Sequence, residues 1–162
     1  MVKSGNKTKW VNGINKTIEH TGFKVDDKKS NRDILYLTND KTGEHHIAVR
    51  GTDASSRGLK KAQDVMTDLK FALGKETHDK HFKNKINRIN NLVKQAPEDA
   101  KISMSGHSLG GGVATEALKS KKNVRERVAH TDTYNAAFSP FTKKASKWVC
   151  FQFFYSSNAI FS

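Results

Sequence analysis

A glycine-flanked serine between a strand and a helix is the feature that most constrains how this chain folds. Residues 101–105 predict a short strand, and residues 113–119 have the composition of a helix. Between them stands Gly106-His107-Ser108-Leu109-Gly110. At such a turn the serine takes a strained backbone conformation that exposes its hydroxyl above the sheet. Side chains at Gly106 and Gly110 would collide with the adjoining strand and helix, which sets this pattern apart from an ordinary glycine-rich turn with a capping serine.

The remaining pattern predicts an α/β fold with a mostly parallel sheet flanked by helices. Alternation of strands and helices in the second half of the chain implies parallel strands with helices packed on their faces. The predicted elements are an amphipathic helix through Trp10, Ile14 and Ile18, a hairpin of strands over 33–38 and 44–50, helices over 62–73 and 82–93, and a strand within 128–138 that ends at 134–137.

Length and composition favour one basic domain over residues 1–162, with a basic N-terminal extension over 1–30 and an atypical aromatic tail over 141–162. The 29 Lys and Arg against 16 Asp and Glu give a net charge of +13, which attracts anionic membrane surfaces or polyanions. No nucleic-acid motif accompanies this charge, so nucleic-acid binding is the weaker interpretation. The single Cys150 excludes an internal disulfide. Without a signal peptide or membrane-spanning run, we expect a cytoplasmic or otherwise intracellular protein.

Four segments, taken in order, resemble the class 3 (fungal-type) lipases of the α/β-hydrolase superfamily. The segments are Ile47-Ala48-Val49-Arg50-Gly51-Thr52, Asp64-Val65-Met66-Thr67-Asp68-Leu69, Gly106-His107-Ser108-Leu109-Gly110-Gly111 and Thr133-Tyr134-Asn135-Ala136-Ala137. Together they cover roughly residues 34–140, and the combination is more specific than any one segment. The resemblance implies an α/β-hydrolase fold, shortened here at its C-terminal side.

The resemblance also implies roles for particular residues. Ser108 is then the nucleophile, and Thr52 and the backbone N–H of Leu109 form the oxyanion hole. Gly106, His107, Gly110 and Asp68 are then motif residues, with His107 in a packing and hydrogen-bonding role. Neither a cofactor nor a metal is expected.

The general base has no position that the family motifs assign. In the family an Asp and then a His follow the nucleophile, but no histidine follows His130 here. We place His130 and Asp132 at the beginning of their strand, too far from the end where Ser108 lies. Of the other histidines (His20, His45, His46, His78, His81 and His107), His78 and His81 are the candidate substitute bases, because their segment precedes the nucleophile strand. We therefore expect slow ester turnover, well below a kcat of about 10 per second.

Two classes of function follow from these observations. The first is a serine carboxylic-ester hydrolase that acts on lipids, as a lipase or phospholipase, through an acyl-enzyme at Ser108. Its partners are a lipid ester and an anionic membrane surface. The second is a catalytically impaired lipase-like domain that binds lipid surfaces or a protein partner. A protein chain that completes the sheet at residues 147–155 is a further expected partner, because an open strand edge receives other strands.

Overall fold

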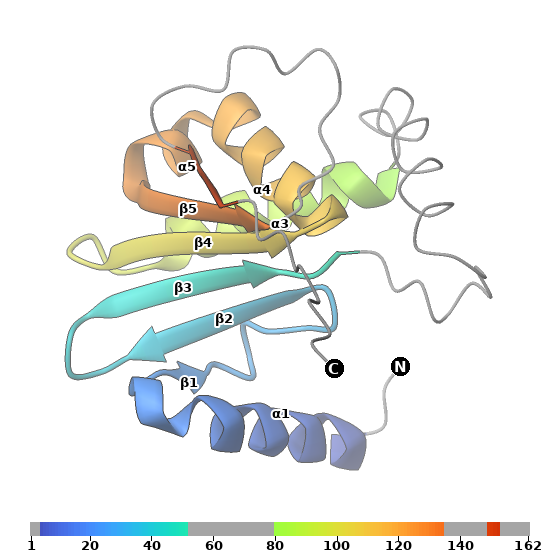
Figure 1. Cartoon of the computed structure of the whole chain (residues 1–162), viewed down its shortest axis with the longest axis vertical. Coiled ribbons are helices and arrows are strands. Elements are labelled where there is room, and N and C mark those ends of the chain that lie inside the picture. Colours follow the sequence, from blue (N-terminus) through green and yellow to red (C-terminus); the bar gives the residue numbers. More distant parts are fainter. Residues whose placement is uncertain (1–3, 52–79, 135–148, 153–162) are drawn as a thin grey trace, which may run out of the picture.

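Six strands form one mixed sheet in a computed structural model of the chain, which describes residues 4–51, 80–134 and 149–152 (Figure 1). Their order in the sheet follows the chain: β1 (Lys24–Val25), β2 (Ile34–Asn39), β3 (Glu44–Val49), β4 (Lys101–His107), β5 (Val128–Tyr134) and β6 (Val149–Gln152). β1, β2 and β3 are antiparallel neighbours, whereas β3, β4, β5 and β6 are parallel. The expected mostly parallel, α/β-hydrolase-like sheet is confirmed.

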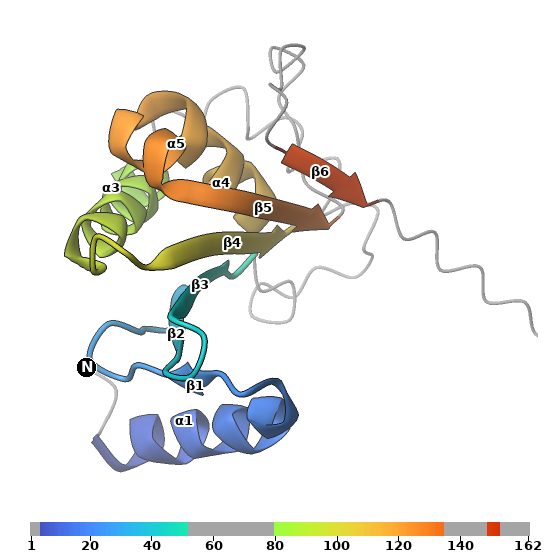
Figure 2. The ribbon, with the colours of Figure 1, turned by 90° about the vertical axis from the view of Figure 1, so that its left-hand side faces the viewer.

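Helices flank this sheet at two places (Figure 2). α3 (Lys80–Gln95), α4 (Leu109–Ser120) and α5 (Lys122–Arg127) lie together on one face of the parallel strands. Crossovers between parallel strands are right-handed, so successive crossovers in one direction place their helices on the same face. α1 (Ser4–Ile18) lies beside β1 and continues into a 3-10 turn, η1 (Glu19–Thr21).

The core lies between the parallel strands and α3 and α4. Alternate side chains of β2, β3 and β4 are buried on this side, among them Tyr36, Ile47 and Met104. α3 meets them with the apolar stripe that the sequence predicts, since residues three and four apart share one face of a helix. Its members Phe82, Ile86, Ile89 and Val93 are all buried.

Several element boundaries differ from the predicted ones. α4 begins at Leu109 rather than at 113, because Gly110, Gly111 and Gly112 are buried inside the helix. Residues 122–127 form α5 where we expect only a connection; its backbone is anchored because the Arg127 guanidinium donates to the carbonyl oxygens of Val93 (2.9 Å) and Ala96 (3.1 Å). β1 is too short for its pattern to predict it. The predicted helix over 62–73 lies outside the described residues.

Candidate active site

Ser108 has the strained backbone that its place in the sequence predicts. It joins the end of β4 to the first residue of α4 with φ 53° and ψ −123°. Among the described residues, Ser108 is the only residue other than glycine that has a positive φ. Such a conformation costs about 1–3 kcal/mol and persists only where the surroundings impose it. Here the Ser108 N–H donates to the carbonyl oxygen of Tyr134 (2.9 Å), and its own carbonyl accepts from Gly111 N–H (3.0 Å).

Three glycines allow the backbones around Ser108 to touch. A Cβ on Gly106 would lie 2.5 Å from the carbonyl carbon and oxygen of Gly110. A Cβ on Gly110 would lie 2.2 Å from the carbonyl oxygen of Val49. The structure therefore gives the predicted steric reason for both glycines and adds a third, since a Cβ on Gly51 would lie 2.6 Å from the His107 carbonyl oxygen. We expect Gly51 only to end its strand, because no short-range pattern shows which backbone it will contact.

The backbone N–H of Leu109 is positioned as an anion donor. Leu109 is the first residue of α4, where an N–H has no partner within the helix and the helix dipole favours negative charge. Within the described part of the chain, no group accepts a hydrogen bond from the Leu109 N–H. Thr52, the second expected donor, lies outside the described residues, and so do Asp68 and His78. Gly51, directly before Thr52, brings β3 to the turn: its Cβ would lie 3.5 Å from Ser108 Cβ.

The described histidines do not complete a triad with Ser108. Among the described residues, none forms a hydrogen bond with the Ser108 hydroxyl. His81 is the second residue of α3. His107 has an exposed side chain without a hydrogen-bond partner among the described residues. The reason is the strand alternation, which turns His107 away from the buried Gly106.

Polar side chains form a row across β3, β4 and β5 on the face away from α3. His46 lies between two serines, with Nδ1 2.8 Å from Ser103 Oγ and Nε2 2.8 Å from Ser105 Oγ. His130 Nε2 lies 2.8 Å from Asp132 Oδ1. His46 is paired with Ser103, five residues before Ser108, which at about 3.3 Å per residue is roughly 16 Å away. These groups do not serve Ser108.

One expectation about this row is wrong. Asp132 is the fifth of seven residues in β5 and pairs with Ser105, so it does not stand at the beginning of its strand. The strand begins earlier than its composition suggests, because α5 ends at Arg127 and β5 begins at the next residue, Val128. Asp132 nevertheless pairs with a residue three positions before Ser108, so it lies away from the end of β4 where Ser108 stands. Its carboxylate forms a hydrogen bond with His130.

The burial of His46 predicts a loss of stability in mild acid. Burial lowers the pKa of His46 below 6.5, an effect that the His130 charge adds to and the Asp132 charge opposes. His46 in the unfolded chain therefore becomes protonated near pH 6.5, whereas His46 in the folded chain is protonated only at lower pH. The free energy of unfolding consequently falls as pH drops below about 6.5. One such group changes the free energy of unfolding by at most about 1.4 kcal/mol per pH unit. We expect the urea midpoint to fall less between pH 7.5 and 5.5 in His46→Gln than in the unmodified chain, and equal pH slopes would contradict this.

The strain at Ser108 predicts that glycine there stabilises the fold. Glycine adopts a positive φ without steric cost but loses more backbone entropy on folding. We expect Ser108→Gly to unfold with a free energy about 1 kcal/mol higher than Ser108→Ala, which keeps the Cβ and its strain. Urea denaturation of the two variants measures the difference. Equal midpoints would show that the positive φ stores no strain.

Comparisons with known proteins give one match. A family model for a Tle-like phospholipase domain matches residues 13–138. Comparison with curated proteins found no match, and comparison with solved structures found none either. Within the described part of the chain, no helix is long and apolar enough to cross a membrane, and no group of three or more His, Cys, Asp or Glu is arranged to hold a metal ion.

Proposed function

Because the chain belongs to the family of Tle-like phospholipase domains, we propose that it is a serine carboxylic-ester hydrolase that acts on phospholipids through an acyl-enzyme at Ser108. The observation that carries this proposal is the backbone of Ser108, held at φ 53° between a parallel strand and a helix N-terminus. That arrangement costs folding free energy, and at a strand-to-helix turn it presents the serine hydroxyl above the sheet, as a nucleophile requires.

The reaction assigns each group one task. The Ser108 Oγ attacks the acyl carbonyl carbon while a base takes the hydroxyl proton, and the carbonyl oxygen becomes an oxyanion. The Leu109 N–H and Thr52 donate to that oxyanion; loss of one such donor typically raises the barrier by about 2.7–4 kcal/mol. Collapse of the tetrahedral intermediate breaks the ester bond, and the alcohol leaves with the proton. Water then hydrolyses the acyl-enzyme and regenerates Ser108.

The base and the finer family relationship are also part of this proposal. His78 and His81 remain the candidate bases, His81 from the first turn of α3. The resemblance to class 3 lipases supports an oxyanion residue after Gly51, where β3 reaches the turn beside Ser108. A net charge of +13 supports action at an anionic phospholipid surface, where each Lys or Arg near the surface contributes about 1 kcal/mol.

A fluorophosphonate probe tests the proposal directly. Such a probe reacts with an activated serine hydroxyl and leaves a covalent adduct that intact-mass and peptide mass spectrometry locate. We expect one adduct per chain on Ser108 and none on Ser108→Ala. A folded sample that remains unlabelled, or that is labelled at another serine, would overturn the proposal.

The second candidate is a lipase-like domain that binds lipid surfaces or a protein partner without turnover. It is favoured by the observation that no described side chain forms a hydrogen bond with the Ser108 hydroxyl. Liposome co-sedimentation separates the two functions. Binding that survives Ser108→Ala in a sample without labelling or turnover supports this second function.

A further inference from the structure

We propose that the pocket between α1 and the strands β2 and β3 holds the acyl chain of the phospholipid whose ester reacts at Ser108, an inference that rests on the proposed function. The pocket has a volume of about 850 Å³. Pockets of roughly 300–1,000 Å³ are typical of small-molecule sites.

The walls of the pocket are mainly apolar and come from α1, β2, β3 and the loop over 30–33. Trp10 and Ile14 of α1 face Leu35 of β2 and Ala48 of β3. Among the described residues, Trp10 is the one large apolar side chain that is exposed, at 36%. Apolar surface left open in a concave site is a mark of a ligand site, because its burial against an apolar group is favourable. A hydrocarbon chain is the ligand that matches such walls.

The charges at the pocket select an anionic ligand. Lys7, Arg32 and Arg50 line it, and Arg32 is exposed to solvent. Asp33 is the acidic residue of the lining, and its Oδ1 lies 3.2 Å from Lys85 Nζ, which offsets its charge. Guanidinium groups bind phosphate oxygens through paired hydrogen bonds. Apolar walls with basic residues in the lining therefore fit one acyl chain attached to a phosphate-bearing head.

The pocket adjoins the candidate nucleophile. Val49 and Arg50 line it, and the same residues touch the serine turn, since a Cβ on Gly110 would meet the Val49 oxygen and the Arg50 carbonyl carbon. The ends of β3 and β4 and the first turns of α1 lie at the same end of the sheet (Figure 1). Neighbouring strands are about 4.8 Å apart, so the pocket over β2 and β3 begins one to two strands from Ser108. An acyl chain spans that distance with its carbonyl at Ser108.

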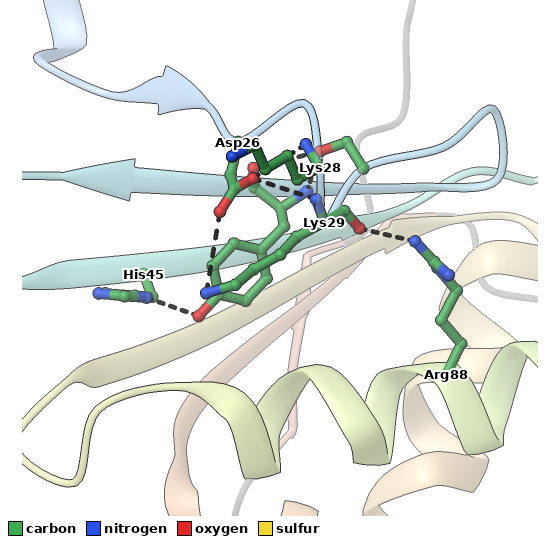
Figure 3. A network of polar contacts seen from close by, with 7 residues as sticks. Asp26, Lys28, Lys29, His45 and Arg88 are labelled. Atoms are coloured by element: carbon green, nitrogen blue, oxygen red, sulfur yellow. Dashed lines mark hydrogen bonds and ion pairs between the residues drawn. The ribbon is translucent and has the colours of Figure 1, made fainter.

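Polar contacts fix residues 26–29, the loop that leads into the pocket wall at 30–33 (Figure 3). Asp26 Oδ1 accepts hydrogen bonds from the N–H groups of Lys28 and Lys29, both at 3.0 Å. The Lys29 carbonyl accepts from Arg88 of α3 (2.7 Å), and Lys29 Nζ lies 4.7 Å from the centre of the Tyr36 ring. The loop leads directly into Ser30, which lines the pocket. These contacts order the segment that leads into the wall, which lowers the ordering cost of binding.

Fluorescence of Trp10 tests the proposal in a chain that also carries Trp148→Phe and Ser108→Ala. Trp10 is then the single indole, and no chemistry occurs. The probe is 12-bromododecanoate, whose bromine quenches an indole that it touches. We expect saturable quenching that a single-chain lysophospholipid below its micelle concentration reverses and that glycerophosphocholine, the same head without a chain, does not. Absence of saturation, or reversal by the head alone, would overturn the proposal.

Two further variants locate the bound chain. Ile14→Asp puts a charge on the pocket wall, and we expect it to raise the dissociation constant of the probe at least about tenfold. Ile18→Asp, at another half-buried position of the same helix outside the lining, is the matched control. Ala48→Leu fills the pocket from β3 without disturbing α1 and is expected to weaken binding similarly. Equal affinities in all three would overturn the proposal. Because binding is measured without Ser108, a failed labelling experiment and a failed pocket are distinguishable.

Discussion

Replacing Ser108 with alanine is expected to lower ester turnover by about 10³-fold or more, because the acyl-enzyme loses its attacking atom. The substrate is a soluble short-chain ester, and the measurement is initial rate for both purified chains. The strained turn persists in the variant because the Cβ remains, so the change removes one oxygen and little else.

Ser105→Ala is the matched control for this experiment. Ser105 Oγ lies 2.8 Å from His46 Nε2, so this pair is a competing serine and base, and of the two serines beside His46 it is the one nearer to Ser108 along β4. Ser105 stands inside β4, where strand pairing with β3 and β5 engages backbone N–H groups, and no helix N-terminus faces it. We expect Ser105→Ala to keep its turnover. If turnover fell in Ser105→Ala and persisted in Ser108→Ala, the assignment of the nucleophile would be wrong.

Replacing Gly110 with alanine is expected to lower the free energy of unfolding by about 3 kcal/mol or more. The new Cβ would lie 2.2 Å from the carbonyl oxygen of Val49 and 2.9 Å from the carbonyl carbon of Arg50. Both atoms belong to backbone, so no side chain moves aside, and β3 must separate from α4. The gain of about 1 kcal/mol from alanine inside a helix is smaller than this cost.

Gly13→Ala is the matched control, because Gly13 is also helical and nothing lies within 4 Å of its added Cβ. We expect Gly13→Ala to raise the free energy of unfolding by about 0.5–1 kcal/mol. Urea denaturation of both variants beside the unmodified chain measures the two effects. A Gly110→Ala chain as stable as Gly13→Ala would show that β3 and α4 are not in backbone contact.

Local pattern was enough for most of the elements that hold the candidate site. Apolar residues at helical spacing predicted α3, and the hairpin of β2 and β3 followed from two apolar runs with a turn between them. The conformation of Ser108 was also predictable, because Gly106 and Gly110 stand two residues before and after it at a strand-to-helix turn, which leaves few backbone alternatives. These properties depend on residues that lie close to one another in the sequence.

Tertiary structure alone decided which distant groups meet. The contact of Gly51 with the serine turn joins residues more than fifty positions apart, and the packing of β3 on β4 creates it. The level of Asp132 along β5 was wrong in the sequence reading because strand register depends on where α5 ends. The pocket beneath α1 combines residues from α1, β2, β3 and the loop over 30–33, and no sequence motif indicates that they meet. Sequence determines the local backbone, whereas register and close approach arise from packing between segments, for which a local pattern holds no information.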